Sequence, residues 1–248
     1  MSVSLNKYIS DSGYCSRREA DSYIEQGRVT INEVYAKKGN RVEIGDRVTV
    51  DGEKIKSKQT DYIYLALNKP KGITCTTDLK DPNNIINFIN FKSRIFPVGR
   101  LDKLSEGLII LTNNGDIVNK ILRASNQHEK EYIVTVDRPF NADFVNRMKR
   151  GIKVLGEYTK KCEVIQLSEN KFKIILKQGL NRQIRRMCEA IGYKVTSLVR
   201  VRIMNLTLEN ISKGKWRFFT QDEIKSLNQL LELSKSEDEL LGMGGLNE

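Results

Sequence analysis

The sequence predicts an α+β protein in two folded parts, with a mixed, largely antiparallel sheet in the larger part. Three observations lead to this class. Some short runs alternate between apolar and polar residues, as strands do, and other runs repeat apolar residues at helical spacing. The two kinds of run follow one another without a strict β-α-β rhythm, and neighbouring strands are often separated only by turns.

The first part is expected at residues 1–60, with two short helices and a small sheet. The first helix is predicted in LNKYISDSGY. The second begins after Ser16, an N-cap residue with Glu19 three positions later, and ends at Gly27. The runs RVTINEVY and DRVTVDGEKI then alternate as strands do.

The second part is expected at residues 61–230, and its elements follow from the same two patterns. Strands are predicted at YIYLALNKP, GLIILTNNGD, KEYIVTVD, CEVIQLSE, KFKIILKQ and VTSLVRVRIMNLTLE, and helices at NNIINFINFK, IVNKILRAS, ADFVNRMKRGI and NRQIRRMCEAIGY, the last ending at Gly192. The run Lys56–Asp61 has no apolar residue and is predicted to be a linker, and residues 231–248 are expected to form an acidic tail.

The charge of the chain indicates a polyanionic partner. With 248 residues and 39% hydrophobic content the chain buries a real core, yet its formal net charge is +11. Residues 181–220 alone hold nine Lys and Arg against two Asp and Glu. These cations are mixed with apolar residues and do not form one amphipathic helix, which favours a folded nucleic-acid surface over a membrane partner.

Several other classes of site are not supported by the sequence. It has no apolar run of about 18 residues and no apolar leader, so we expect a cytoplasmic protein without a membrane partner. The four cysteines, Cys15, Cys75, Cys162 and Cys188, are scattered, which predicts neither a zinc site nor a disulfide framework. Since neither a metal-ligand cluster nor a phosphate-binding glycine loop is present, we expect a reaction without metal or cofactor.

One acid lies in a position that suits catalysis. In FPVGRLDKLSEGLIILTNNGD, Asp102 lies shortly before an apolar strand and follows Arg100 by two residues. A carboxylate fixed in a loop beside a guanidinium stays ionised, as a nucleophile or a charge stabiliser must. By spacing alone, a structural turn remains the better interpretation.

The first part resembles the S4 RNA-binding domain. The resemblance covers LNKYISDSGYCSRREADSYIEQGRVTINEVYAKKGNRVEIGDRVTV, nearly the whole of the part. It implies that Lys7, Arg17, Arg18 and Arg28 lie on or beside two helices and meet phosphates. A solvated helical face is the alternative.

The second part resembles the pseudouridine synthases of the RsuA/RluB/RluE/RluF family. GRLDKLSEGLIILTNNGD is similar to the signature around the catalytic aspartate of that family, here Asp102. EKEYIVTV resembles the segment with the active-site tyrosine, here Tyr132, and QGLNRQIRRMCEAIGYKVTSLVRVRIMNL resembles the segment with its basic partner, here Arg185. With LALNKPKGITCT the resemblance spans roughly residues 1–225. Leu104 departs from the pattern, since relatives usually have a polar or acidic residue there.

The resemblance implies a role for each residue of the catalytic set. Asp102 stabilises or captures C1′ of the ribose, as a carboxylate does in glycoside hydrolysis, or instead removes a proton from the sugar. Tyr132 stacks on the uracil, although without the resemblance it would read as a core tyrosine. Arg185 pairs with Asp102 and orients it.

Further basic residues are expected to hold the RNA. Arg100 would fill the space that the flipped base leaves or hold its phosphate. Arg182 and Arg186 would meet phosphates, although Arg186 is also well described as a solvated helix residue. The resemblance gives no role to the only histidine, His128.

The substrate follows from the flanking residues. QGLNRQIRRMCEAIGY and VRIMNL resemble the RluF type, which implies a monomer acting on 23S ribosomal RNA, with transfer RNA as a further candidate. The alternatives are a 16S ribosomal RNA synthase of the same family and a non-catalytic, S4-type ribosomal RNA-binding or assembly factor, which would have lost Asp102. A sugar hydrolase would need a second carboxylate opposite the first, and Glu106 is only four residues on.

Overall fold

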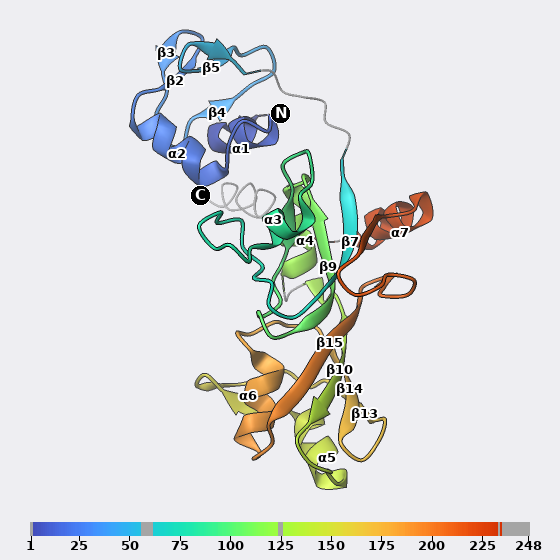
Figure 1. The fold of residues 1–248 in the computed structure, drawn as a ribbon. Helices are drawn as coiled ribbons and strands as arrows, with labels where there is room; N and C mark the ends of the chain where they lie inside the picture. The colour runs from blue at the N-terminus through green and yellow to red at the C-terminus, as the bar shows by residue number, and fades with distance from the viewer. Residues whose placement is uncertain (1, 56–61, 124–125, 233, 235–248) are drawn as a thin grey trace. The chain divides into compact units, whose positions relative to one another are not determined.

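The chain folds into two compact units, Met1–Tyr62 and Ile63–Glu248 (Figure 1). The computed structural model describes residues 2–55, 62–123, 126–232 and 234. The predicted linker Lys56–Asp61, and with it the predicted boundary at residue 60, lies outside the described residues, as does most of the predicted acidic tail.

The N-terminal unit packs two helices against short strands. Its elements are β1 (Val3–Ser4), α1 (Leu5–Asp11), α2 (Arg17–Glu25), β2 (Val29–Ile31), β3 (Val34–Tyr35), β4 (Arg41–Val42), β5 (Val48–Val50) and β6 (Glu53–Lys54). Strands β3-β2-β5-β6 form one antiparallel sheet, and β1 pairs with β4. The run RVTINEVY is a hairpin, where we predicted one strand, because Asn32 and Glu33 both take positive φ angles and turn the chain back.

The second helix of this unit begins as its sequence predicts. The Ser16 hydroxyl accepts a hydrogen bond from the Glu19 N–H at 3.2 Å, and the Glu19 carboxylate accepts one from the Ser16 N–H at 2.8 Å. The helix ends just before Gly27, which has a φ of +68°. Ile9, Ala20 and Ile24 of the two helices are buried in one apolar core with the strands.

The C-terminal unit is built on one mixed sheet. Its strands in chain order are β7 (Tyr64–Lys69), β8 (Phe96–Val98), β9 (Glu106–Thr112), β10 (Lys130–Val136), β13 (Glu163–Gln166), β14 (Lys171–Leu176), β15 (Val195–Ile203), β16 (Leu206–Thr207) and β17 (Trp216–Phe218). Their order is β13-β14-β10-β15-β9-β7-β17, with β8 also on β9 and β16 also on β15. Within the described residues every pairing in this sheet is antiparallel except β9 with β15.

Helices cover this sheet, and the first four of them lie at the predicted places. They are α3 (Ile85–Ile89), α4 (Asp116–Leu122), α5 (Ala142–Arg150), α6 (Gln183–Ala190) and α7 (Gln221–Leu231). A small hairpin, β11 (Lys153–Val154) with β12 (Glu157–Tyr158), follows α5. The predicted α+β class and the largely antiparallel sheet are confirmed, whereas β8, β17, the hairpin and most of α7 were not predicted.

The two halves of the sheet join where β9 meets β15. Only two residue pairs are aligned there, Glu106 with Val199 and Gly107 with Arg200. Gly107 has a φ of +105°, and a Cβ atom on it would lie 2.2 Å from the carbonyl oxygen of Arg200. The strands therefore approach closely only because this residue is glycine. The cleft described next lies at this junction.

Candidate active site

A cleft of about 870 Å³ opens beside the junction of β9 and β15. It is lined by the loop before β9, by β10 and β15, and by the N-terminal end of α6 with the loop that precedes it. The fold brings five predicted site residues to its lining: Arg100, Asp102, Tyr132, Arg182 and Arg185.

Asp102 lies in a loop that is fixed on both sides. The Leu101 N–H donates to the Cys75 sulfur at 3.4 Å, and the Ser105 N–H donates to the Asp102 carbonyl at 2.9 Å. The Lys103 carbonyl accepts from the Gly72 N–H at 2.8 Å. Leu101 is buried in the core beside the loop, whereas the Asp102 side chain keeps about a third of its surface exposed. The loop therefore holds the backbone of Asp102 in place and leaves its carboxylate accessible in the cleft.

Arg185, on α6, binds the same loop. Its Nη2 donates to the Leu104 carbonyl at 3.3 Å and the Ser105 hydroxyl at 3.2 Å, and its Nη1 donates to the Val195 carbonyl at 3.2 Å. Its Nε lies 3.8 Å from Oδ2 of Asp102. Burial and the neighbouring Arg182 lower the pKa of Arg185 from its ordinary value, and Asp102 opposes them.

The departure at Leu104 leaves this arrangement intact. Arg185 uses the carbonyl of Leu104, and the Leu104 side chain is exposed. A polar residue at this position would offer Arg185 the same carbonyl. The difference from relatives therefore concerns the surface of the loop.

The other basic residues around the cleft differ in how close they come to it. Arg182 directly precedes α6, and its Nη1 lies 3.9 Å from Oδ2 of Asp102. Arg100 is exposed and lines the cleft. Arg186 is not part of the lining, since its guanidinium turns back to the carbonyl and side chain of Asn181.

Tyr132 lies on β10 beside the sheet junction. Its backbone is aligned with Ile174 of β14 and Arg200 of β15, next to an irregularity in the pairing between Glu131 and Tyr132. The ring is half-buried, packs against the apolar cores on both sides of the junction, and lines the cleft. A ring in this position offers a flat apolar surface to a base.

Three buried cations near the cleft were not predicted. Lys69 donates to the carbonyls of Pro70 and Ile73, both at 2.9 Å, and Arg200 donates through Nε to the Leu108 carbonyl at 2.7 Å. Lys130 and Arg200 also line the cleft. Burial, and then the nearby Arg200, lowers the pKa of Lys130 to about 8. The sequence did contain a sign that Lys69 is buried. This lysine ends the largely apolar run YLALNK, and continuous apolar runs of this kind form strands that are buried on both faces.

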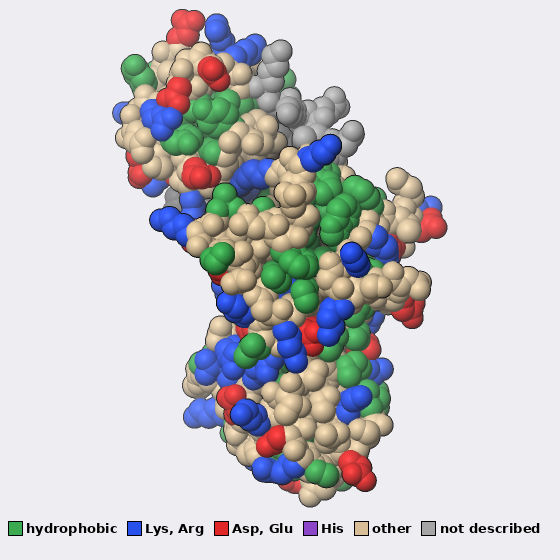
Figure 2. All heavy atoms as spheres, in the orientation of Figure 1, with side chains coloured by type: hydrophobic (Ala, Val, Ile, Leu, Met, Phe, Trp, Pro, Cys, Tyr) green, Lys and Arg blue, Asp and Glu red, His purple; other side chains and the backbone are tan. Residues whose placement is uncertain are grey.

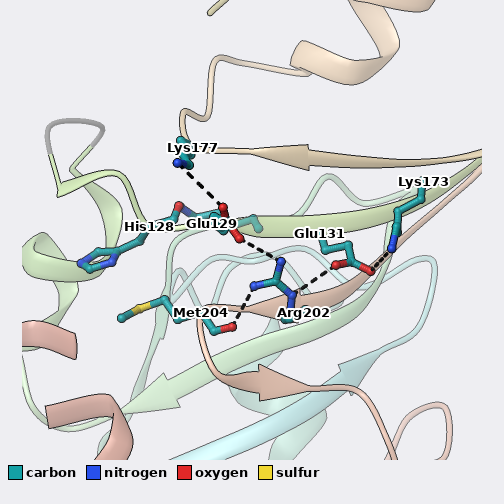
Figure 3. A network of polar contacts seen from close by, with 8 residues as sticks. His128, Glu129, Glu131, Lys173, Lys177, Arg202 and Met204 are labelled. Atoms are coloured by element: carbon teal, nitrogen blue, oxygen red, sulfur yellow. Dashed lines mark hydrogen bonds and ion pairs between the residues drawn. The ribbon is translucent and has the colours of Figure 1, made fainter. Parts of the chain in front are cut away.

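His128 is not part of the cleft lining among the described residues. Its Nε2 lies 2.8 Å from the Ser234 hydroxyl. Beside it, Arg202 of β15 binds Glu129 at 3.0 Å and Glu131 at 3.2 Å, with Lys173 and Lys177 near the same carboxylates (Figure 3). These contacts give His128 and its neighbours a structural explanation.

The four basic residues that we predicted to contact phosphates in the N-terminal unit differ in their exposure and in the partners that they already have. Arg17 and Arg18 lie in the first turn of α2, and Arg18 is exposed. Lys7 lies 3.8 Å from Asp11 on the same helix. Arg28 is already bound, because it donates through two nitrogens to Asp51, whose pKa it lowers, and lies 4.1 Å above the ring of Tyr23.

Comparisons with known proteins agree with this geometry. The model of the RNA pseudouridylate synthase family matches residues 63–190, and the S4 domain model matches residues 3–48. The chain belongs to the RNA pseudouridylate synthase family. The enzyme class and the N-terminal S4 domain that the sequence predicted are thereby confirmed.

This pseudouridine synthase has well-covered relatives. It is 55% identical over 237 residues to the dual-specificity RNA pseudouridine synthase RluF of Escherichia coli strain K12, covering 95% of this chain and 82% of the relative. It is 32% identical over 241 residues to the ribosomal large subunit pseudouridine synthase B of Bacillus subtilis strain 168, covering 94% and 98%. A pseudouridylate synthase of known crystal structure is 29% identical with a TM-score of 0.66, over 91% of this chain and 99% of that one.

The charge of the synthase agrees with an RNA substrate. Its net charge of +11 is suited to a polyanion. None of the helices in the described residues has the length and apolar content that crossing a bilayer requires.

Proposed function

We propose that this synthase isomerises a uridine of 23S ribosomal RNA and that Asp102 is the carboxylate that acts at C1′. One observation carries the proposal: in a single cleft that Tyr132 also lines, Oδ2 of Asp102 lies 3.8 Å from Arg185 and 3.9 Å from Arg182. The 55% identity to RluF and the name of the Bacillus subtilis relative, a large-subunit enzyme, support the choice of RNA.

The reaction breaks the bond from C1′ to N1 of uracil and forms a bond from C1′ to C5. The nucleotide must first leave its stack, which costs a few kcal/mol. As the first bond breaks, positive character develops on the sugar, and Asp102 stabilises or captures it. The uracil then turns and rejoins through C5. The C5 proton leaves, N1 takes up a proton, and the reaction has no net redox change.

Each residue of the cleft has a role in this proposal. Tyr132 stacks on the uracil, and its hydroxyl serves the loss of the C5 proton. Arg185, whose guanidinium is held by three hydrogen bonds, orients Asp102. Arg100 and Arg182 hold the phosphates around the flipped nucleotide. In the S4 domain we assign phosphate contacts to Lys7, Arg17 and Arg18, and weaker ones to Arg28.

Arg186 receives only a peripheral role here, because it is bound to Asn181 outside the cleft. The sugar hydrolase alternative needs Glu106 as a second catalytic carboxylate, and Glu106 is also engaged by other residues. The two oxygens of Glu106 lie 2.6 Å from Lys213 and 3.7 Å from Lys71, so this acid neutralises two lysines.

A second RNA substrate is supported by the Escherichia coli relative, which is named a dual-specificity enzyme. We propose transfer RNA as the second substrate of this chain. We also propose that the enzyme acts as a monomer, and both RNAs would place it in the cytoplasm.

The test is the release of tritium from ribosomal RNA that is labelled with [5-³H]uridine and taken from a strain lacking the enzyme. The wild-type protein should release tritium from 23S RNA, and Asp102→Asn should not, because only the charge has been removed. Asp143→Asn, on the exposed first turn of α5, is the matched control and should behave like wild type.

The same assay on other RNAs decides between the substrates. Release from transfer RNA would support dual specificity. Release from 16S RNA alone would overturn the choice of 23S RNA, and full activity of Asp102→Asn would remove Asp102 from the mechanism.

A further inference from the structure

An aromatic patch lies at the outer edge of the C-terminal sheet. It consists of Phe91, Trp216 and Phe218, whose ring centroids lie between 5.6 and 6.1 Å apart in edge-on contacts. The exposed fractions of Trp216 and Phe218 are 37% and 55%. Trp216 and Phe218 belong to β17, the last strand on its side of the sheet. Large aromatic residues that remain exposed together commonly mark a binding surface.

The patch is set on one face of the sheet by strand pairing. Trp216 is aligned with Leu67 and Phe218 with Leu65, so both rings share the face on which those leucines are buried with α3. Arg217, between them, points to the opposite face and binds Glu223 of α7 through two nitrogens at 2.7 Å. β17 is therefore fixed from behind, which presents the two rings as a rigid surface.

The two segments that carry the patch are basic. Segments 85–95 and 211–220 contain no acidic residue, and apart from Arg217, which binds Glu223 on the opposite face, they contain Lys92, Arg94, Lys213 and Lys215. Lys92, Lys213 and Lys215 are exposed. Hydrophobic side chains lie next to lysines and arginines around α3 and β7 in the view of Figure 2. Aromatic rings among cations are the composition with which proteins hold unpaired nucleotides.

A line of lysines connects the patch with the loop of Asp102. Lys213, two residues before Lys215, lies 2.6 Å from Glu106, and Lys71 lies 3.7 Å from the other oxygen of that carboxylate. The next residue, Gly72, donates its N–H to the carbonyl of Lys103. A strand whose uridine occupies the cleft would thus meet cations on its way to the patch.

We propose that the aromatic patch is a second RNA-binding site of this enzyme, at which unpaired nucleotides flanking the modified uridine stack on Trp216 and Phe218. The site is specific for single-stranded RNA, because a base must expose its face in order to stack. The exposed Lys92 and Lys215 neutralise the phosphates of this strand. The inference rests on the proposed function, since it concerns the same RNA.

Trp216 itself provides the first readout, because it is the only tryptophan of the chain. Its fluorescence is recorded in Asp102→Asn, so that no turnover occurs, while a short oligouridylate is added. The oligouridylate should quench the fluorescence, and a blunt RNA duplex of the same length should quench it much less. In Phe218→Ala the affinity measured in this way should fall about tenfold, the size of one lost stacking contact. An unchanged Trp216 spectrum would overturn the proposal.

Turnover of 23S RNA provides the second readout. Trp216→Ala and Phe218→Ala should raise KM about tenfold with little change in kcat, because the patch lies away from the reacting atoms. Trp216→Phe should keep most of the wild-type KM. Tyr158→Ala is the matched control, because Tyr158 is an aromatic residue with 74% exposure on β12 of the same unit. Unchanged KM values in the two alanine variants would overturn the proposal.

The two proposals fail in different ways. Tritium release by the wild-type enzyme without any response of Trp216 leaves the isomerase standing and removes the patch. Quenching of Trp216 by oligouridylate without tritium release from any ribosomal RNA leaves the patch standing and removes the proposed function.

Discussion

The Nε atom of Arg185 lies 3.8 Å from Oδ2 of Asp102 and has no hydrogen-bond partner within the described part of the chain. The other two nitrogens of this guanidinium are bound to three acceptors, two of which, Leu104 and Ser105, belong to the loop of Asp102. One arginine therefore fixes the loop and leaves one N–H near the carboxylate. A short movement of the Asp102 side chain would complete that hydrogen bond.

This arrangement predicts that Arg185 cannot be replaced by another cation. In Arg185→Lys the charge stays, but a single ammonium group cannot reproduce the planar set of three hydrogen bonds. We expect turnover to fall roughly 100-fold and the free energy of unfolding to fall by about 1–3 kcal/mol. Tritium release and urea unfolding measure the two effects. Arg186→Lys is the control, because the Arg186 guanidinium bonds Asn181 and no other described residue, outside the cleft. Wild-type turnover in Arg185→Lys would contradict the role.

The close approach of β9 and β15 predicts that Gly107 is essential to the fold around the cleft. Its Cβ in Gly107→Ala would lie 2.2 Å from the Arg200 carbonyl, so the only parallel pairing in the described sheet must open. We expect a loss of roughly 3 kcal/mol or more of unfolding free energy. Urea unfolding followed by Trp216 fluorescence reports on this unit.

A second glycine separates the two causes of that loss. Gly156 has a φ of +89° but no atom within 4 Å of its ideal Cβ, so Gly156→Ala carries only the backbone strain. That strain should cost about 1–2 kcal/mol. Equal losses in the two variants would show that the conformation of Gly107, and not the contact with Arg200, sets its cost.

The S4 domain should contribute to RNA binding mainly through α2. Deleting residues 1–60 should weaken RNA binding and flatten its dependence on salt. Each lost phosphate contact should reduce the slope of log K against log salt by about 0.7–0.9. We therefore expect a larger reduction from Arg17→Ala with Arg18→Ala than from Arg28→Ala, because Arg28 is already engaged by Asp51. Filter binding across a salt series measures the slopes, and identical slopes in all variants would argue against phosphate contacts here.

The sequence was sufficient for most of the long elements, with α7 as the exception, and insufficient for the shortest strands. β7 and β9 are continuous apolar runs with a turn behind them, and both were predicted. β8 and β17 have three residues each, too few for a period to show. The start of α7 carried a readable signal that was missed, since Thr220 and Glu223 form a capping box like that of Ser16 and Glu19.

The candidate site divides in a similar way. Asp102, Tyr132 and Arg185 were predicted from the family resemblance, because each lies in a recognisable motif. Lys130 and Arg200 were missed, since their burial depends on the pairing of β10 with β15, which are far apart in the sequence, and nothing in the sequence next to either residue marks it as buried. The aromatic patch depends in the same way on the pairing of β17 with β7.

Lys130 should make the stability of the protein depend on pH in a defined direction. Its pKa is lowered from 10.5 to about 8, mainly by burial. Between these two values the unfolded chain holds more protons than the folded chain, so the free energy of unfolding should rise with pH there, by at most about 3 kcal/mol.

The variant Lys130→Met tests this pH dependence, because it removes the buried charge. At about pH 7 this variant should therefore be more stable than wild type, and the difference should shrink as the pH approaches 10. Urea unfolding at several pH values measures it, with Lys153→Met, on the exposed end of β11, as the control. A difference that stays constant with pH would mean that Lys130 titrates alike in the folded and unfolded chains, and that its burial next to Arg200 carries no cost.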